Sequence, residues 1–153
     1  MNVEQIKVLM MEIPLFDQLT PDERSLLAGY IEYSVIKKGT QVIKEGALGT
    51  NLLYIVSGKM EIKKESIDGR QAVISQFGKG SIVGELALLE NESRRSASAN
   101  AVEDCEILSL PRKNFDEILK TNPNIGIVVL RGIGCTLANR LRNITGRFAD
   151  IFN

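Results

Sequence analysis

A short stretch between residues 84 and 97 contains the residue types that bind a phosphate and a sugar. Gly84 permits close approach of the backbone to a ligand. The run that follows Glu85 has good helical propensity, and one helical turn there would present free N–H groups to an anion. Arg95 comes ten residues after Glu85, and its planar guanidinium suits a phosphate. Because a carboxylate repels a phosphate but accepts a hydrogen bond from a hydroxyl, the pattern predicts a site for a phosphate joined to a sugar.

Two other interpretations of these charged residues are open at the level of the sequence. Glu85 and Arg95 could form a surface ion pair, which contributes at most about 1 kcal/mol. Arg94 could bind the phosphate in place of its neighbour. We favour Arg95, because Ser96 and Ala97 follow it directly and set the register of the stretch.

The composition argues against catalysis and against direct nucleic-acid binding. The chain has no histidine and no acidic cluster at metal-ligand spacing, so we expect neither an enzyme such as a phosphodiesterase nor a metal site. Nineteen basic residues balance nineteen acidic ones, which is not the charge distribution of a nucleic-acid binder. With 153 residues, 44% of them hydrophobic and 25% charged, we expect one globular domain over 1–153.

The cysteines, the N-terminus and the apolar stretches all bear on the cellular compartment in which the protein is expected. Cys105 and Cys135 stand among apolar residues without a close partner in sequence, which predicts buried free thiols and a reducing environment. The N-terminus lacks the basic and then apolar pattern of a signal peptide. The longest apolar stretch, at 125–130, is too short to span a bilayer. We therefore expect a cytoplasmic protein with no membrane partner.

The elements that must position the site divide the chain into three parts. Residues 1–30 are predicted to be helical, with a capping box at Thr20 and Glu23. Residues 31–111 alternate short apolar and polar runs with glycine turns, and Asp68-Gly69 marks a hairpin between runs 60–65 and 71–77. Residues 112–153 are predicted to form C-terminal helices, the last of them long. The predicted fold is mainly β: an eight-stranded antiparallel jelly-roll β-barrel with flanking helices.

Several landmarks along the chain, taken with the 84–97 stretch, resemble the cyclic-nucleotide-binding domain family. They are Leu15-Phe16, Lys38-Gly39-Thr40, Lys44-Glu45-Gly46, Tyr54-Ile55-Val56-Ser57-Gly58, Asp68-Gly69-Arg70 and Asn122-Pro123. The stretch itself is similar to the family's phosphate-binding cassette. The ten-residue spacing from Glu85 to Arg95 is similar to that of the bacterial catabolite activators in this family.

The resemblance implies a role for each matching residue. Glu85 would bind the ribose 2′-hydroxyl, and Arg95 the cyclic phosphate. Amides near Leu86 and Ala87 would also hold the phosphate, and Ser96 would add a hydrogen bond. The remaining implied site residues are Gly84 and Ala97 in the cassette, Val83, Ile62 and Ile74 along the sugar and base cavity, and Arg140 and Thr145 on the long helix. Thr145 would reach the base of a partner subunit's ligand.

Some of these roles have simpler alternatives. Arg140 could be a solvated helix charge and Thr145 plain surface, and Ile62 and Ile74 could be ordinary core residues. Ile144 stands where the catabolite activators carry a threonine that contacts adenine. We expect cAMP as the ligand, with cGMP as the alternative.

The long C-terminal helix carries two interleaved heptad series, which predict a homodimer through a coiled-coil seam. The series are Ile127, Gly134, Leu141 and Phe148, and Leu130, Leu137, Ile144 and Ile151. The alternative is a helix that packs one stripe on its own barrel.

Taken together, these features predict a cyclic-nucleotide sensor that relays ligand occupancy through its C-terminal helix to an unidentified output protein. No DNA-binding segment follows the long helix, so we expect a stand-alone sensor or a piece of a longer protein. The alternative is the same fold without nucleotide binding, acting as a dimerisation or interaction domain.

Overall fold

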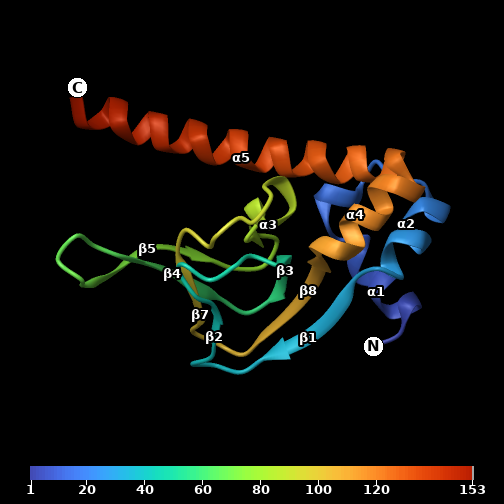
Figure 1. Ribbon diagram of the computed structural model, residues 1–153, viewed down its shortest axis with the longest axis horizontal. Coiled ribbons are helices and arrows are strands. Elements are labelled where there is room, and N and C mark those ends of the chain that lie inside the picture. Colours follow the sequence, from blue (N-terminus) through green and yellow to red (C-terminus); the bar gives the residue numbers. More distant parts are fainter. Residues whose placement is uncertain (153) are drawn as a thin grey trace.

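The computed structural model describes residues 1–152, and its central part consists of eight antiparallel strands in two four-stranded sheets (Figure 1). The first sheet has the order β1 (Glu32–Ile36), β8 (Cys105–Pro111), β3 (Asn51–Ser57) and β6 (Ile82–Val83). The second has the order β2 (Gln41–Ile43), β7 (Ser98–Ala101), β4 (Met60–Glu65) and β5 (Gln71–Phe77). The predicted mainly β fold with helices at both ends is confirmed.

The closed barrel of the prediction is not formed. Within residues 1–152 no strand ladder joins one sheet to the other. The edge strands β6 and β2 have only two and three residues, which is too short to carry a continuous ladder around a barrel. The strands are therefore arranged as two sheets whose inner faces pack together.

Alternation along β3 separates two hydrophobic clusters. Leu53 and Ile55 point into the cluster between the sheets, which also contains residues of β2, β4, β6, β7 and β8. Leu52 and Tyr54 point the other way, into a cluster shared with the helices. Successive side chains of a strand face opposite sides, so both faces of the first sheet are buried at β3.

The helices gather on the outer face of the first sheet. The N-terminal ones are α1 (Val3–Met10), the 3₁₀ turn η1 (Pro14–Phe16) and α2 (Pro21–Ala28), and the C-terminal ones are α4 (Arg112–Thr121) and α5 (Pro123–Phe152). The capping box predicted at Thr20 and Glu23 is present at the start of α2. A further short helix, α3 (Leu86–Leu89), lies between β6 and β7, where one helical turn is predicted.

The two halves of α5 differ in their surroundings. In the N-terminal half, Ile125, Val129 and Ile133 are buried in the helix cluster, and Gly132 lies against Leu15. In the C-terminal half, residues 141–152 are all exposed. This half passes beyond α3, on the side of the β4–β5 hairpin (Figure 1). No helix in the described part of the chain is both long enough and apolar enough to cross a membrane.

Candidate functional site

The predicted site residues converge on one cavity of about 130 Å³ beside the cluster between the sheets. All of them line it except Ile74 and Thr145. Val83, Gly84 and the α3 turn form one side, and residues 95–97 form another. Arg140 of α5 reaches the cavity from outside the sheets. The fold thus brings together predicted site residues that are up to 78 positions apart, from Ile62 to Arg140.

Gly84 is required at its position by both conformation and space. Its φ is +76°, a left-handed conformation that side chains rarely adopt. A Cβ atom there would lie 2.2 Å from Nη1 of Arg95. The Gly84 carbonyl accepts a hydrogen bond from the same Nη1 at 3.0 Å. The glycine therefore allows the arginine to lie directly against the backbone at the start of α3.

Arg95 is held in place by the backbone and side chain of Asn51. Its Nη2 donates to the Asn51 carbonyl at 2.8 Å and to the Asn51 Oδ1 at 3.0 Å, and the Asn51 Nδ2 donates to Ser109 Oγ at 2.7 Å. Burial lowers the pKa of Arg95, and the charge of Glu85 partly offsets this effect. An arginine remains protonated under these conditions, so the cavity contains a fixed, half-buried positive charge.

The α3 turn supplies fewer free amides than predicted. The Ala87 N–H donates to the Gly84 carbonyl at 3.2 Å, so the turn itself uses the amide that was expected to bind phosphate. The Leu86 N–H has no acceptor among the described residues. The same holds for the N–H groups of Ser96 and Ala97 on the opposite side of the cavity.

Glu85 pairs with Arg140 rather than with Arg95. Its Oε1 lies 3.1 Å from Arg140 Nη1, and the two side chains are only 14% and 28% exposed. Arg140 also donates to the Ile82 carbonyl, and its guanidinium lies 4.7 Å from the centre of the Phe77 ring. The surface ion pair between Glu85 and Arg95 is therefore absent, and Arg140 is not a solvated helix charge. Arg140 joins α5 to the wall of the cavity.

Arg94 borders the cavity with a different orientation from its neighbour. Its side chain is exposed, and its Nη1 donates to the Gly46 carbonyl at 3.0 Å. Arg95 is the arginine whose guanidinium is half-buried against the α3 turn. This difference supports the assignment of the phosphate to Arg95.

Two predicted residues do not reach the cavity. Ile74 is 55% exposed and Val73 beside it is 53% exposed, because this part of β5 extends beyond the cavity. A register shift in the β4–β5 pairing also leaves Ile74 as an extra residue between Val73 and Ser75. Thr145 is exposed on α5, and its hydroxyl donates to the Leu141 carbonyl of its own helix at 2.9 Å. Neither contributes to the site within a single chain.

Other lining residues escaped the sequence analysis. Phe77 and Ile43 end β5 and β2, and Ala99 lies in the middle of β7. The alternation of apolar and polar residues along each strand could have indicated them. It shows which residues share a face, but which face borders the cavity is known only when the strand register is known. Asn51 carried no signal of its own, since it acts through Arg95.

A family model and two curated relatives, each compared with the sequence of this chain, all name cyclic nucleotides in their descriptions. A family model described as "Cyclic nucleotide-binding domain" matches residues 34–122, more than half of the chain. The chain is 34% identical over 129 residues to the cyclic AMP receptor protein of Thermus thermophilus; the alignment covers 84% of this chain and 57% of that protein. It is 31% identical over 123 residues to the cAMP-dependent protein kinase regulatory subunit of Mycosarcoma maydis, covering 78% of this chain and 23% of that protein.

A solved structure extends the similarity to the fold. A cyclic nucleotide-binding domain from Methylobacillus flagellatus superposes with a TM-score of 0.82 at 27% identity. The superposition covers 95% of this chain and 81% of the other. In contrast, the chain spans little more than half of the Thermus protein and about a quarter of the kinase subunit.

Proposed function

Because the chain belongs to the cyclic nucleotide-binding domain family, we propose that its cavity binds a cyclic nucleotide, preferably cAMP, and performs no chemistry on it. One observation carries this proposal. The cavity brings together a fixed guanidinium, free amides from two segments and a carboxylate, a set of groups that matches a phosphate joined to a ribose.

The phosphate side is formed by Arg95 and by amides from two segments. The guanidinium is already held by the Gly84 and Asn51 carbonyls, so little side-chain entropy is lost when an anion binds. No carboxylate pairs with it among the described residues. The free N–H groups of Leu86 and Ser96 add donors without adding charge.

The sugar side is formed by Glu85. Arg140 pairs with one carboxylate oxygen, Oε1, and Oε2 remains able to accept from a ribose hydroxyl. Because the ion pair orients the carboxylate, its acceptor is in place before the ligand arrives. Ile62, Val83 and Phe77 provide apolar walls.

We further propose that Arg140 relays occupancy to α5. A ligand that bonds to Oε2 of Glu85 adds a partner to the carboxylate that holds an α5 residue through Oε1, and a contact that differs between the free and bound states is what a relay requires. Beyond Arg140, the apolar side chains Leu141, Ile144, Phe148 and Ile151 are each at least 51% exposed. They belong to the predicted heptad seam, and a second copy of the chain would cover them. In such a dimer Thr145 could face the partner's cavity.

The direct test is calorimetric titration of the purified protein with cAMP, cGMP, 5′-AMP and adenosine. We expect binding of cAMP, weaker binding of cGMP, and little binding of adenosine because it lacks the phosphate. The cAMP should be recovered unchanged after long incubation. If neither cyclic nucleotide binds, the alternative of a fold without nucleotide binding is favoured.

A further inference from the structure

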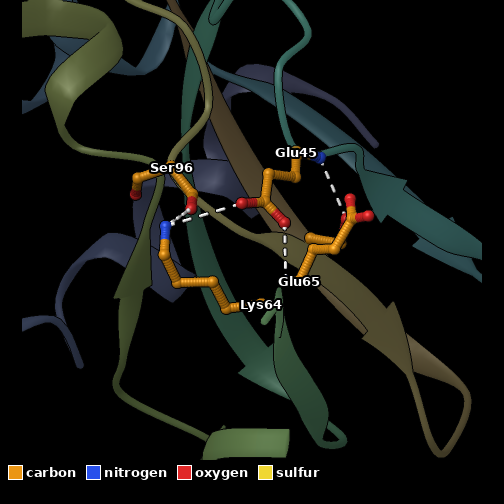
Figure 2. A network of polar contacts seen from close by, with 5 residues as sticks. Glu45, Lys64, Glu65 and Ser96 are labelled. Atoms are coloured by element: carbon orange, nitrogen blue, oxygen red, sulfur yellow. Dashed lines mark hydrogen bonds and ion pairs between the residues drawn. The ribbon is translucent and has the colours of Figure 1, made fainter. Parts of the chain in front are cut away.

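Outside the cavity, the side chain of Lys64 reaches the segment that carries the phosphate-binding residues (Figure 2). Its Nζ donates to the Ser96 carbonyl at 2.6 Å. The same Nζ lies 3.5 Å from Oε1 of Glu45, whose other oxygen accepts from the Glu65 N–H at 3.0 Å. Lys64 itself does not line the cavity.

This contact takes the place of a missing strand ladder. The β4–β7 pairing stops at Lys63 and Ser98, and the chain before Ser98 leaves the sheet to enter the cavity wall. If the β4–β7 ladder continued, the backbone of β4 would bond the Ser96 carbonyl. Instead, the side chain of Lys64, the next residue of β4, donates to this carbonyl. Glu45 is also tied to the start of β7, because its backbone N–H donates to Ser98 Oγ at 2.9 Å.

The two peptide groups on either side of Ser96 are thus anchored from outside. The Arg95 carbonyl accepts from the Gly46 N–H at 2.9 Å, and the Ser96 carbonyl accepts from Lys64. In a trans peptide the N–H points away from the C=O. Fixing these carbonyls therefore directs the N–H groups of Ser96 and Ala97 to the opposite side, and neither has an acceptor among the described residues.

We propose that Lys64, held by Glu45, is a positioning residue for the ligand phosphate that acts through Ser96. This inference rests on the proposed function of the cavity. Lys64 fixes the Ser96 carbonyl and so aligns the free donors of residues 96 and 97 with the phosphate. It also joins the exposed β4–β5 hairpin to the binding segment.

A competing explanation is that Lys64 attracts the phosphate only by its charge. The two explanations differ in the effect of Glu45. If Lys64 acts by charge alone, Glu45→Gln removes a nearby negative charge and tightens binding. If Lys64 acts by position, Glu45→Gln releases it and weakens binding.

The test is titration of cAMP and 2′-deoxy-cAMP into the parent and five variants, with thermal unfolding of each. Lys64→Met should weaken cAMP binding about fivefold, as expected for one partly exposed charge-assisted hydrogen bond. Glu45→Gln should also weaken it, and the double variant should resemble Lys64→Met because both changes break one unit. Lys64→Arg should recover most of the affinity. The preference for cAMP over the 2′-deoxy ligand should stay constant, because Glu85 is untouched.

Lys63→Met is the matched control on the same strand. The Lys63 Nζ lies 3.9 Å from Glu61, and neither residue lines the cavity, so its loss should leave affinity unchanged. The Lys64 side chain is 51% exposed and that of Glu45 is 27% exposed, and pairs of this kind add little to folding stability. We therefore expect all five variants to fold.

Several outcomes would overturn the inference. A parent that binds cAMP while Lys64→Met binds equally well removes Lys64 from the site and leaves the proposed function standing. Tighter binding by Glu45→Gln would show a purely electrostatic role. A parent that binds neither cyclic nucleotide overturns the proposed function and this inference with it.

Discussion

Arg95 is half-buried, and its Nη atoms donate to the carbonyls of Gly84 and Asn51 and to the Asn51 side chain, which would explain how one residue can dominate the binding of an anion. Removing one partner of a desolvated charge pair costs about 2–5 kcal/mol. Arg95→Ala should therefore weaken cAMP binding by well over tenfold in calorimetric titration. Arg94→Ala is the control, because its side chain is exposed and bonded to Gly46. A loss confined to Arg94→Ala would assign the phosphate to the neighbouring arginine.

Glu85 has one carboxylate oxygen bonded to Arg140 and one available to a ligand. An acceptor that is left without its donor in a closed site loses a hydrogen bond to water without replacement. We expect 2′-deoxy-cAMP to bind at least tenfold more weakly than cAMP, measured by competition against a fluorescent cyclic nucleotide. Equal affinity for the two ligands would mean that Glu85 does not contact the ribose.

The two thiols differ in surroundings and should differ in reactivity. Burial raises the pKa of the Cys105 thiol, whose Sγ also donates to the Lys59 carbonyl at 3.3 Å. The thiolate is the reactive form, so a raised pKa slows alkylation. Cys135 is exposed on α5, so the predicted burial of the thiols is confirmed for Cys105 and is wrong for Cys135. At neutral pH a maleimide should therefore label Cys135 within minutes and Cys105 only after unfolding, as peptide mass spectrometry would show. Rapid labelling of Cys105 in the folded protein would contradict its burial.

At the scale of the element, the junction of β6 and α3 depends on Gly84. Gly84→Ala would combine a positive φ with a contact of 2.2 Å to Arg95, and we expect destabilisation by about 2 kcal/mol or more together with weaker cAMP binding. Gly80→Ala is the matched control: its φ is +91°, but no atom lies within 4 Å of an added Cβ. It should cost about 1–2 kcal/mol from backbone strain alone and leave binding unchanged.

Denaturant unfolding and titration together check this pair of variants. Equal loss of affinity in both would show that the backbone strain, and not the contact with Arg95, controls the site. A Gly84→Ala protein with parental affinity would show that Arg95 can move away from the backbone without cost to binding.

At the scale of the whole molecule, the exposed half of α5 has an apolar face that its own sheets do not cover. We expect light scattering to give the mass of a dimer for the parent at micromolar concentration. Ile144→Glu combined with Phe148→Glu should give a monomer, because two charges in a seam oppose pairing. Both side chains are more than half exposed, so the folded chain itself should be unaffected. A monomeric parent, with and without cAMP, would exclude this interface.

Local patterns in the sequence were sufficient for several elements and for singling out the 84–97 stretch, which borders the cavity. The capping box at Thr20, the hairpin at Asp68-Gly69 and the turn after Glu85 depend on neighbours within a few residues, and such interactions are visible in sequence. The cassette was also recognisable, because its residues follow one another closely between 84 and 97. The strands before and after this stretch, β6 and β7, lie within the region 31–111 that was predicted to be β.

Long-range contacts were decided only by the tertiary structure. Ile74 lies in the part of β5 that extends beyond the cavity, and how far a strand extends past a site cannot be read from alternation alone. The partner of Glu85 proved to be Arg140, 55 positions away, because the packing of α5 determines which cation reaches it. The same is true of Asn51 behind Arg95 and of the short edge strands that leave the sheets unjoined. Sequence determines which groups a segment carries, whereas register and packing determine which of them meet.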